Sequence, residues 1–134
     1  MTSPRIPPHS VEAEQAVIGG LLVAPDSLDV VRDRLDSADF YRHDHGLIYA
    51  AIVGLASKGQ PFDVVTVSEW LGARDELVDA GGLPYLGSLA SDTLGASNIK
   101  AYAEIVRDAS TKRSLIKFLS ESLGRVFDEG AVPV

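Results

Sequence analysis

Three neighbouring residues, His43, Asp44 and His45, carry the side chains best suited to metal or acid–base chemistry. Imidazole and carboxylate groups ligate zinc, but a zinc site needs three or four ligands that converge on one ion. At a helix start, residues two apart point away from each other. We therefore expect no metal, and instead a helix N-terminal cap with a partly exposed histidine. The alternative is a small hydrolase that uses both histidines and nearby acids, which metal analysis of the purified protein would test.

Other polar and aromatic side chains are better explained by structure than by catalysis. Asp36, Asp39 and Asp63 accompany no nucleophile, base and orienting group at a recognisable spacing, so we expect solvated faces and caps. Trp70 and Tyr85 are expected to be core aromatics. The sequence thus predicts no catalytic residue.

A site for a nucleoside triphosphate is also not expected in this chain. Gly54 and Gly59 have the glycine spacing of a phosphate-binding loop. However, Gln60 and Pro61 stand where that loop requires Lys and then Ser or Thr. The segment also leaves a predicted helix rather than a strand, so we expect no cofactor-binding residue here.

The composition favours a protein partner over a nucleic acid. The 134 residues suit one domain with a real core, and the formal net charge is −7. Domains that neutralise phosphates are usually basic, so we expect little direct nucleic-acid binding. Cysteine is absent, and no run approaches the roughly 20 apolar residues of a membrane span. These features are typical of a cytoplasmic protein.

The apolar residues recur with helical periodicity, which predicts an all-α fold. We expect an extended arm over residues 1–9 and a compact bundle of short helices, the head, over residues 10–96. The expected helices are at about 10–23, capped by Ser10, at 27–35 and at 44–58, then one opened by a capping box from Thr66 to Glu69 and one whose first residue is Pro84.

Small residues interrupt the first predicted helix. Gly19 and Gly20 each cost roughly 1 kcal/mol relative to Ala in a helix interior. Ala13, Ala16 and Gly20 form a track of small side chains along which another helix could approach closely. The other interpretation is that the helix simply tolerates its glycines.

The last element, residues 97–130, is expected to be one helix of about 45 Å, capped by Ser97 or Asn98. Along this helix, a line of residues recurs in alternating steps of three and four, which is the pattern of a coiled-coil seam. Two members of the seam, Arg113 and Ser120, are polar. An ordinary amphipathic helix on its own head is the alternative, although the length argues against this for the second half. A seam needs a partner helix, from a second copy or from chain beyond Val134. Changing Val106 or Ile116 to Asp is expected to disrupt assembly and leave the head folded. The seam residues are Ile99, Tyr102, Val106, Ala109, Arg113, Ile116, Ser120, Leu123 and Phe127.

A basic cluster lies on the same helix. It consists of Arg107, Lys112, Arg113 and Lys117. Such runs are usually a solvated helix face. The second interpretation is a strip that forms ion pairs with an acidic partner hairpin or docking protein.

Five ordered blocks of the sequence resemble DnaB-type replicative helicases. The resemblance covers about residues 6–130, and the compatible order and spacing of the blocks make it specific. The blocks are Pro7-Pro8-His9-Ser10-Val11-Glu12-Ala13-Glu14-Gln15-Ala16-Val17-Ile18-Gly19-Gly20-Leu21-Leu22, Asp39-Phe40-Tyr41 with His45 and Ile48-Tyr49-Ala50-Ala51-Ile52, Gly59-Gln60-Pro61-Phe62-Asp63-Val64-Val65-Thr66-Val67, Gly81-Gly82-Leu83-Pro84-Tyr85-Leu86, and the segment from Asn98 to Arg113.

The resemblance implies that the long helix is the first half of a helical hairpin. In that family, hairpins of two subunits pair and three dimers form a collar on a hexameric motor, which docks primase and often a helicase loader. A phage inhibitor is a further candidate partner. The second hairpin helix and the motor, which uses ATP and Mg²⁺ to unwind DNA, would lie outside this chain. The alternative is a free-standing regulator or decoy, and the gene sequence after Val134 would distinguish the two.

Overall fold

The computed structural model describes residues 5–129, and every regular element within that range is helical. Residues 1–4 of the predicted arm and residue 130 of the predicted long helix lie outside the described residues. The elements are α1 (Val11–Val23), the 3₁₀ turn η1 (Pro25–Ser27), α2 (Leu28–Val31), the 3₁₀ turn η2 (Ser37–Asp39), α3 (His43–Ser57), α4 (Val64–Ala73), α5 (Gly82–Asp92) and α6 (Ile99–Glu129).

The helix starts follow local capping chemistry. The Ser10 side chain accepts a hydrogen bond from the Ala13 amide at 3.1 Å, as predicted for the start of α1. The predicted capping box at Thr66 to Glu69 is wrong by one turn. Asp63 caps α4, and its carboxylate and the Thr66 hydroxyl exchange bonds with each other's amides at 2.8 Å. An aspartate is the better cap because its charge also favours the positive end of the helix dipole.

Two other helix boundaries differ from expectation. The second helix is only Leu28–Val31, because the residues after Pro25 form a 3₁₀ turn first. The helix α5 begins at Gly82, two residues before Pro84, where the preceding Gly81 adopts a left-handed φ of 99°. Proline is still compatible with that position, because the amides of the first turn have no partner inside the helix.

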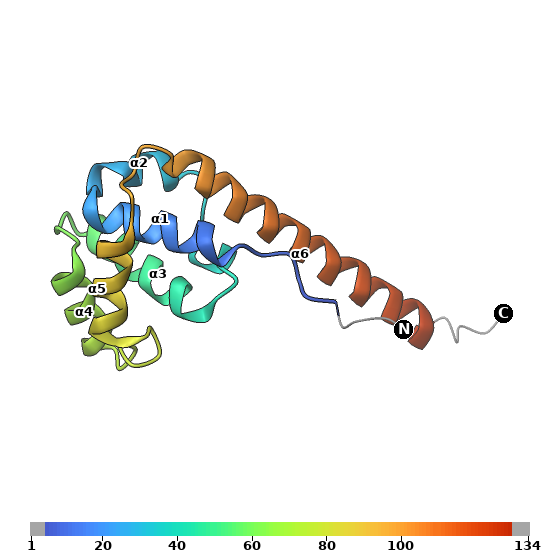
Figure 1. Ribbon diagram of the computed structural model, residues 1–134. Helices are drawn as coiled ribbons and strands as arrows, with labels where there is room; N and C mark the ends of the chain where they lie inside the picture. The colour runs from blue at the N-terminus through green and yellow to red at the C-terminus, as the bar shows by residue number, and fades with distance from the viewer. Residues whose placement is uncertain (1–4, 130–134) are drawn as a thin grey trace.

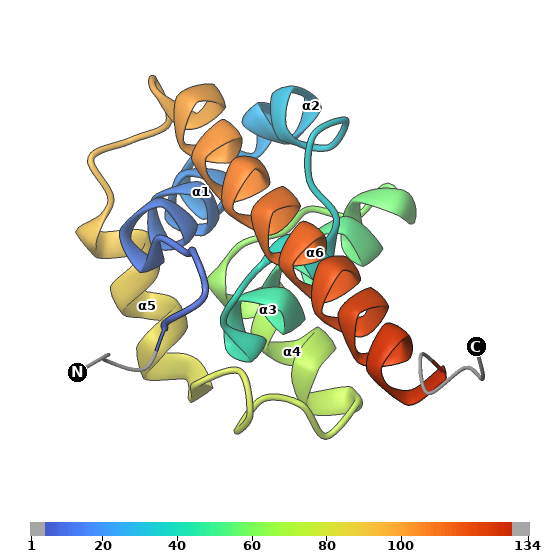
Figure 2. The same cartoon turned by 90° about the vertical axis from the view of Figure 1, so that its right-hand side faces the viewer.

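The helix α1 lies at the centre of the head and is covered by α3, α5 and α6 (Figures 1 and 2). Its residues Val17, Ile18 and Leu21 are fully buried. The helix α4 closes the far side of the head against α3 and α5. Burial of this many apolar side chains is the main stabilising contribution to the fold.

The small residues of α1 allow neighbouring helices to come close. A side chain at Gly19 would overlap the backbone carbonyl of Leu89 on α5, and one at Gly20 would lie 3.1 Å from Ile99 on α6. The closest helix approach is thus at Gly19, beside the predicted track of Ala13, Ala16 and Gly20, whereas Gly20 meets the end of the Ile99 side chain. Tolerance of glycine is not a sufficient explanation at Gly19.

The loop between α2 and η2 is fastened by a buried tyrosine. Tyr49 on α3 is 1% exposed, and its hydroxyl donates to the Leu35 carbonyl at 2.9 Å. Burial raises the pKa of Tyr49 to about 12, because the phenolate would lose its hydration inside the core.

The helix α6 extends well past the head. Its first half lies across α1 and α2, and its second half projects away from them (Figure 1). Of the helices within residues 5–129, none is long and apolar enough to cross a membrane.

Candidate functional site

The first half of α6 is anchored by apolar side chains on one face. Ile99, Ala103 and Val106 are buried at 4%, 0% and 1% exposure and belong to the same core as α1. These positions recur at three and four residues, which is the spacing of one helical face. This half of α6 is therefore part of the head.

A polar clamp holds the middle of α6. The buried Asp39 carboxylate accepts from Ser110 at 2.7 Å and from Arg107 at 3.2 Å. The Arg113 guanidinium donates to the Asp39 carbonyl at 2.6 Å and to the Pro8 carbonyl at 2.8 Å, joining the N-terminal arm to α6. We call these five residues the α6 clamp. From residue 114 to residue 128, no α6 residue is buried.

The clamp changes the interpretation of the basic cluster. Arg107 and Arg113 bond to this chain's own Asp39 and backbone, so the strip is not one surface that faces a partner. Lys112 and Lys117 are exposed. Only these two remain free for the ion pairs that the sequence suggested.

The projecting half of α6 has an exposed apolar face, and we call it the α6 apolar face. At 3.6 residues per turn, its centre lies about 170° around the helix from the face that packs on the head. Large side chains on it are 50–74% exposed, whereas Lys117 and Glu121 lie on the opposite side of the helix. The α6 apolar face consists of Leu115, Ile116, Phe118, Leu119, Leu123, Val126 and Phe127.

The predicted seam does not lie on one surface. Ile99 and Val106 are in the core, Tyr102 and Ala109 are half-buried, and Arg113 is in the α6 clamp. Ile116, Leu123 and Phe127 are exposed members of the α6 apolar face, and Ser120 is exposed outside it.

Helix geometry explains this division. A seam of period 3.5 drifts by about 20° per heptad on a straight helix, or about 80° over four heptads. The seam that starts on the buried face of α6 at Ile99 therefore ends on the edge of the α6 apolar face at Phe127. The seam missed Leu115, Phe118, Leu119 and Val126, which only a separate reading of the second half could have found.

A buried polar network connects three helices of the head. Glu14 on α1 is 1% exposed and accepts from the Tyr41 amide at 2.7 Å and the Arg42 amide at 3.3 Å. Its carboxylate also lies 2.7 Å from His45 Nδ1, and His45 Nε2 lies 2.6 Å from the Tyr85 hydroxyl. The network positions α1, α3 and α5 relative to one another.

This network corrects the expectation for the histidines. His43 is exposed, but His45 is fully buried between a carboxylate and a phenol. Asp44 bonds to Arg42 and to the His45 amide, and the bond to Asp44 raises the pKa of Arg42. Because no substrate can reach His45 at 0% exposure, the geometry is structural and does not support the hydrolase alternative.

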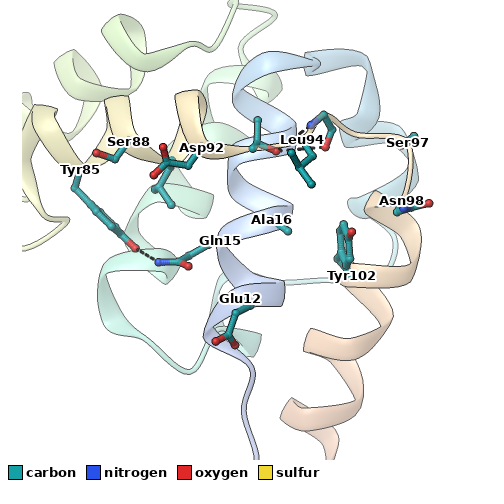
Figure 3. A pocket seen from close by; sticks show the side chains of 13 residues that line it. Glu12, Gln15, Ala16, Tyr85, Ser88, Asp92, Leu94, Ser97, Asn98 and Tyr102 are labelled. Atoms are coloured by element: carbon teal, nitrogen blue, oxygen red, sulfur yellow. Dashed lines mark hydrogen bonds between the residues drawn. The ribbon is translucent and has the colours of Figure 1, made fainter.

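A pocket of about 320 Å³ opens beside this network, between α1, α5 and the start of α6 (Figure 3). Tyr85 accepts a hydrogen bond from Gln15 at 3.3 Å, and its hydroxyl also lies 2.6 Å from His45, which is not part of the pocket lining. The lining contains the carboxylates of Glu12 and Asp92 but no imidazole, Lys or Arg. Within residues 5–129, no three His, Asp or Glu side chains lie close enough to hold a metal ion. The pocket therefore does not contain the two histidines on which the hydrolase alternative depends.

Comparison with known proteins agrees with this architecture. The family described as the DnaB-like helicase N terminal domain matches residues 6–108. A curated relative, the replicative DNA helicase DnaB of Pasteurella multocida, is 41% identical over 111 residues, which cover 83% of this chain. The chain spans about a quarter of that relative's length, at 24%.

Solved structures are similar over nearly the whole chain. The N-terminal domain of DnaB helicase from Mycobacterium tuberculosis matches with a TM-score of 0.91 and 37% identity, covering 96% of this chain and 91% of that one. A DnaB-like replicative helicase, described with its interactions with primase, matches with a TM-score of 0.78 and 27% identity, covering 87% of this chain and 28% of that one. The all-helical head with its projecting helix, together with these matches, establishes that this chain belongs to the DnaB-like helicase N-terminal domain family.

Proposed function

We propose that this domain assembles a replicative helicase by pairing the α6 apolar face with helices outside the described residues. The observation that carries the proposal is the seven large apolar side chains exposed on the projecting half of α6. A helix end this apolar is unfavourable in water, and such faces are typical of association surfaces.

The direction of the apolar face supports pairing rather than folding back. The face lies on the side of α6 opposite to the head, so this chain's own head cannot cover it. A second helix of a hairpin, and the hairpin of another subunit, would cover it from that side. Three such dimers would form the collar of a hexamer whose motor unwinds DNA with ATP and Mg²⁺.

Docking of primase is the second part of the proposal. It is supported by the related helicase structure that was described with its interactions with primase. The net charge of −7 favours such a protein partner over direct DNA binding. A helicase loader or a phage inhibitor could use the same collar.

Light scattering over a concentration series tests assembly through α6. We expect the chain to self-associate, and we expect Leu119→Asp to shift it towards monomer, because a charge would be buried without a partner. Ser114→Asp is the matched control, since Ser114 is exposed and lies about 150° around the helix from the centre of the α6 apolar face. A chain that is monomeric throughout, or that associates equally with Leu119→Asp, would contradict self-association through this face.

A further inference from the structure

The C-terminal end of α3 and the helix α4 lie at the other end of the head from the projecting half of α6 (Figure 1), and a second apolar surface is found there. It is a groove of about 570 Å³ between the C-terminal end of α3 and the outer side of α4. Its walls are mainly the apolar side chains of Leu55, Pro61, Val65 and Trp70. The groove does not include the α6 apolar face, so the inference below does not depend on the proposed assembly function.

Trp70 lines this groove and is in close contact with α3 at Gly54 and with the Arg74 side chain. Any side chain at Gly54 would overlap the indole, and the three atoms nearest to it would all be indole carbons. The Arg74 guanidinium lies 3.5 Å from the ring centre and donates to the Trp70 carbonyl at 3.2 Å.

Two cations thus gather on one indole. Lys58, at the end of α3, places its ammonium 5.1 Å from the Trp70 ring centre, beside Arg74. Both side chains are exposed, and neither forms an ion pair with any carboxylate among residues 5–129. Glu69 also lines the groove but is not within ion-pairing distance of either cation. The groove therefore presents two positive charges outside any ion pair against the single carboxylate of Glu69, in a protein of net charge −7.

We propose that this groove binds an acidic segment of a partner protein that also carries apolar side chains. The apolar side chains would pack on Trp70 and its neighbours, and the carboxylates would bond to Lys58 and Arg74. Charge-assisted hydrogen bonds from a guanidinium to a carboxylate are strong and directional. Charge complementarity at the rim would also speed the encounter.

A nucleic acid fits the groove less well. Binding of single strands relies on stacking bases against open aromatic faces. The Arg74 guanidinium already lies over the Trp70 ring at 3.5 Å, and the indole is in close contact with α3 at Gly54.

The test uses the single tryptophan of the chain as a local probe. Three ligands are titrated: the peptide Gly-Asp-Leu-Asp-Phe-Gly, the same peptide with Lys in place of each Asp, and a short oligothymidylate. We expect the acidic peptide alone to change Trp70 fluorescence saturably, and added salt to weaken that response.

Charge reversal at the rim is the matched experiment. Lys58→Glu and Arg74→Glu are each expected to weaken binding of the acidic peptide about tenfold or more, through loss of a charge pair. Lys100→Glu, an exposed reversal on α6, should leave binding unchanged. Since Arg74 itself touches the indole, amide NMR shifts along α4 provide a second readout for every variant.

Three results would each overturn the proposal. The acidic peptide could produce no saturable response, or the lysine peptide could produce the same response. The oligothymidylate could bind saturably and lose that binding on Lys58→Glu, which would assign the groove to nucleic acid.

Discussion

The most discriminating prediction compares one substitution at two places on α6. Val106 is 1% exposed in the head core, whereas Val126 is 65% exposed on the α6 apolar face. Burying an unpaired carboxylate costs about 3–5 kcal/mol, which is a large part of a typical domain stability of about 5–15 kcal/mol. Val106→Asp should therefore unfold or severely destabilise the head. Val126→Asp should change the stability of the monomer by no more than about 0.5 kcal/mol, as is usual for surface sites.

Urea unfolding measures both variants by circular dichroism, with Trp70 fluorescence as a second probe. Ile116→Asp, at a half-exposed site, should behave as Val126→Asp does and should affect only association. The sequence alone suggested that Val106→Asp would spare the head, and burial of that side chain makes this expectation wrong. Equal unfolding midpoints for the two valine variants would refute the division of α6 into an anchored and a projecting half.

Three further predictions concern the head. Glu14→Ala should destabilise it by about 3–5 kcal/mol in urea unfolding, because the substitution leaves buried donors such as His45 without an acceptor; stability like that of the wild type would show that the network is not structural. Gly19→Ala should lower the thermal midpoint by several degrees, since its methyl group overlaps the Leu89 carbonyl, and an unchanged midpoint would contradict the close approach of α5. The pKa of Tyr49 is raised to about 12 in the fold, so its contribution is complete below the unfolded pKa of about 10 and is lost as pH rises from about 10 towards 12; a Tyr49→Phe variant that loses stability over that window as steeply as the wild type would refute this assignment.

The local signals in the sequence were sufficient for most of the head. Ser10 and the following acids define the start of α1, and the glycines of α1 indicate where other helices come close. The cap of α4 was missed because both Asp63 and Thr66 are good capping residues. Only the fold shows that Asp63 precedes the first helical turn.

The roles of polar residues were harder to predict, because they depend on contacts between distant parts of the chain. His45 is 31 residues from Glu14 and 40 from Tyr85, so no local pattern reveals that it is buried. From its spacing, Arg113 was predicted to be a polar interruption of the seam. In the structure it bonds to the backbone carbonyls of Pro8 and Asp39. Such long-range pairs are fixed by packing and leave no periodic signal.

The α6 clamp also has a mechanical consequence, because it is the point about which the projecting half of α6 would tilt as a rigid rod. From Arg113 to the end of α6 at Glu129 the helix runs about 24 Å at 1.5 Å per residue. A tilt of about 10° at the α6 clamp would displace the C-terminal end of α6 by about 4 Å over that length. The hydrogen bonds from Arg113 to the Pro8 and Asp39 carbonyls therefore fix the direction in which the projecting half of α6 points. A small loosening of the N-terminal arm would be magnified at the tip, far from where it occurred.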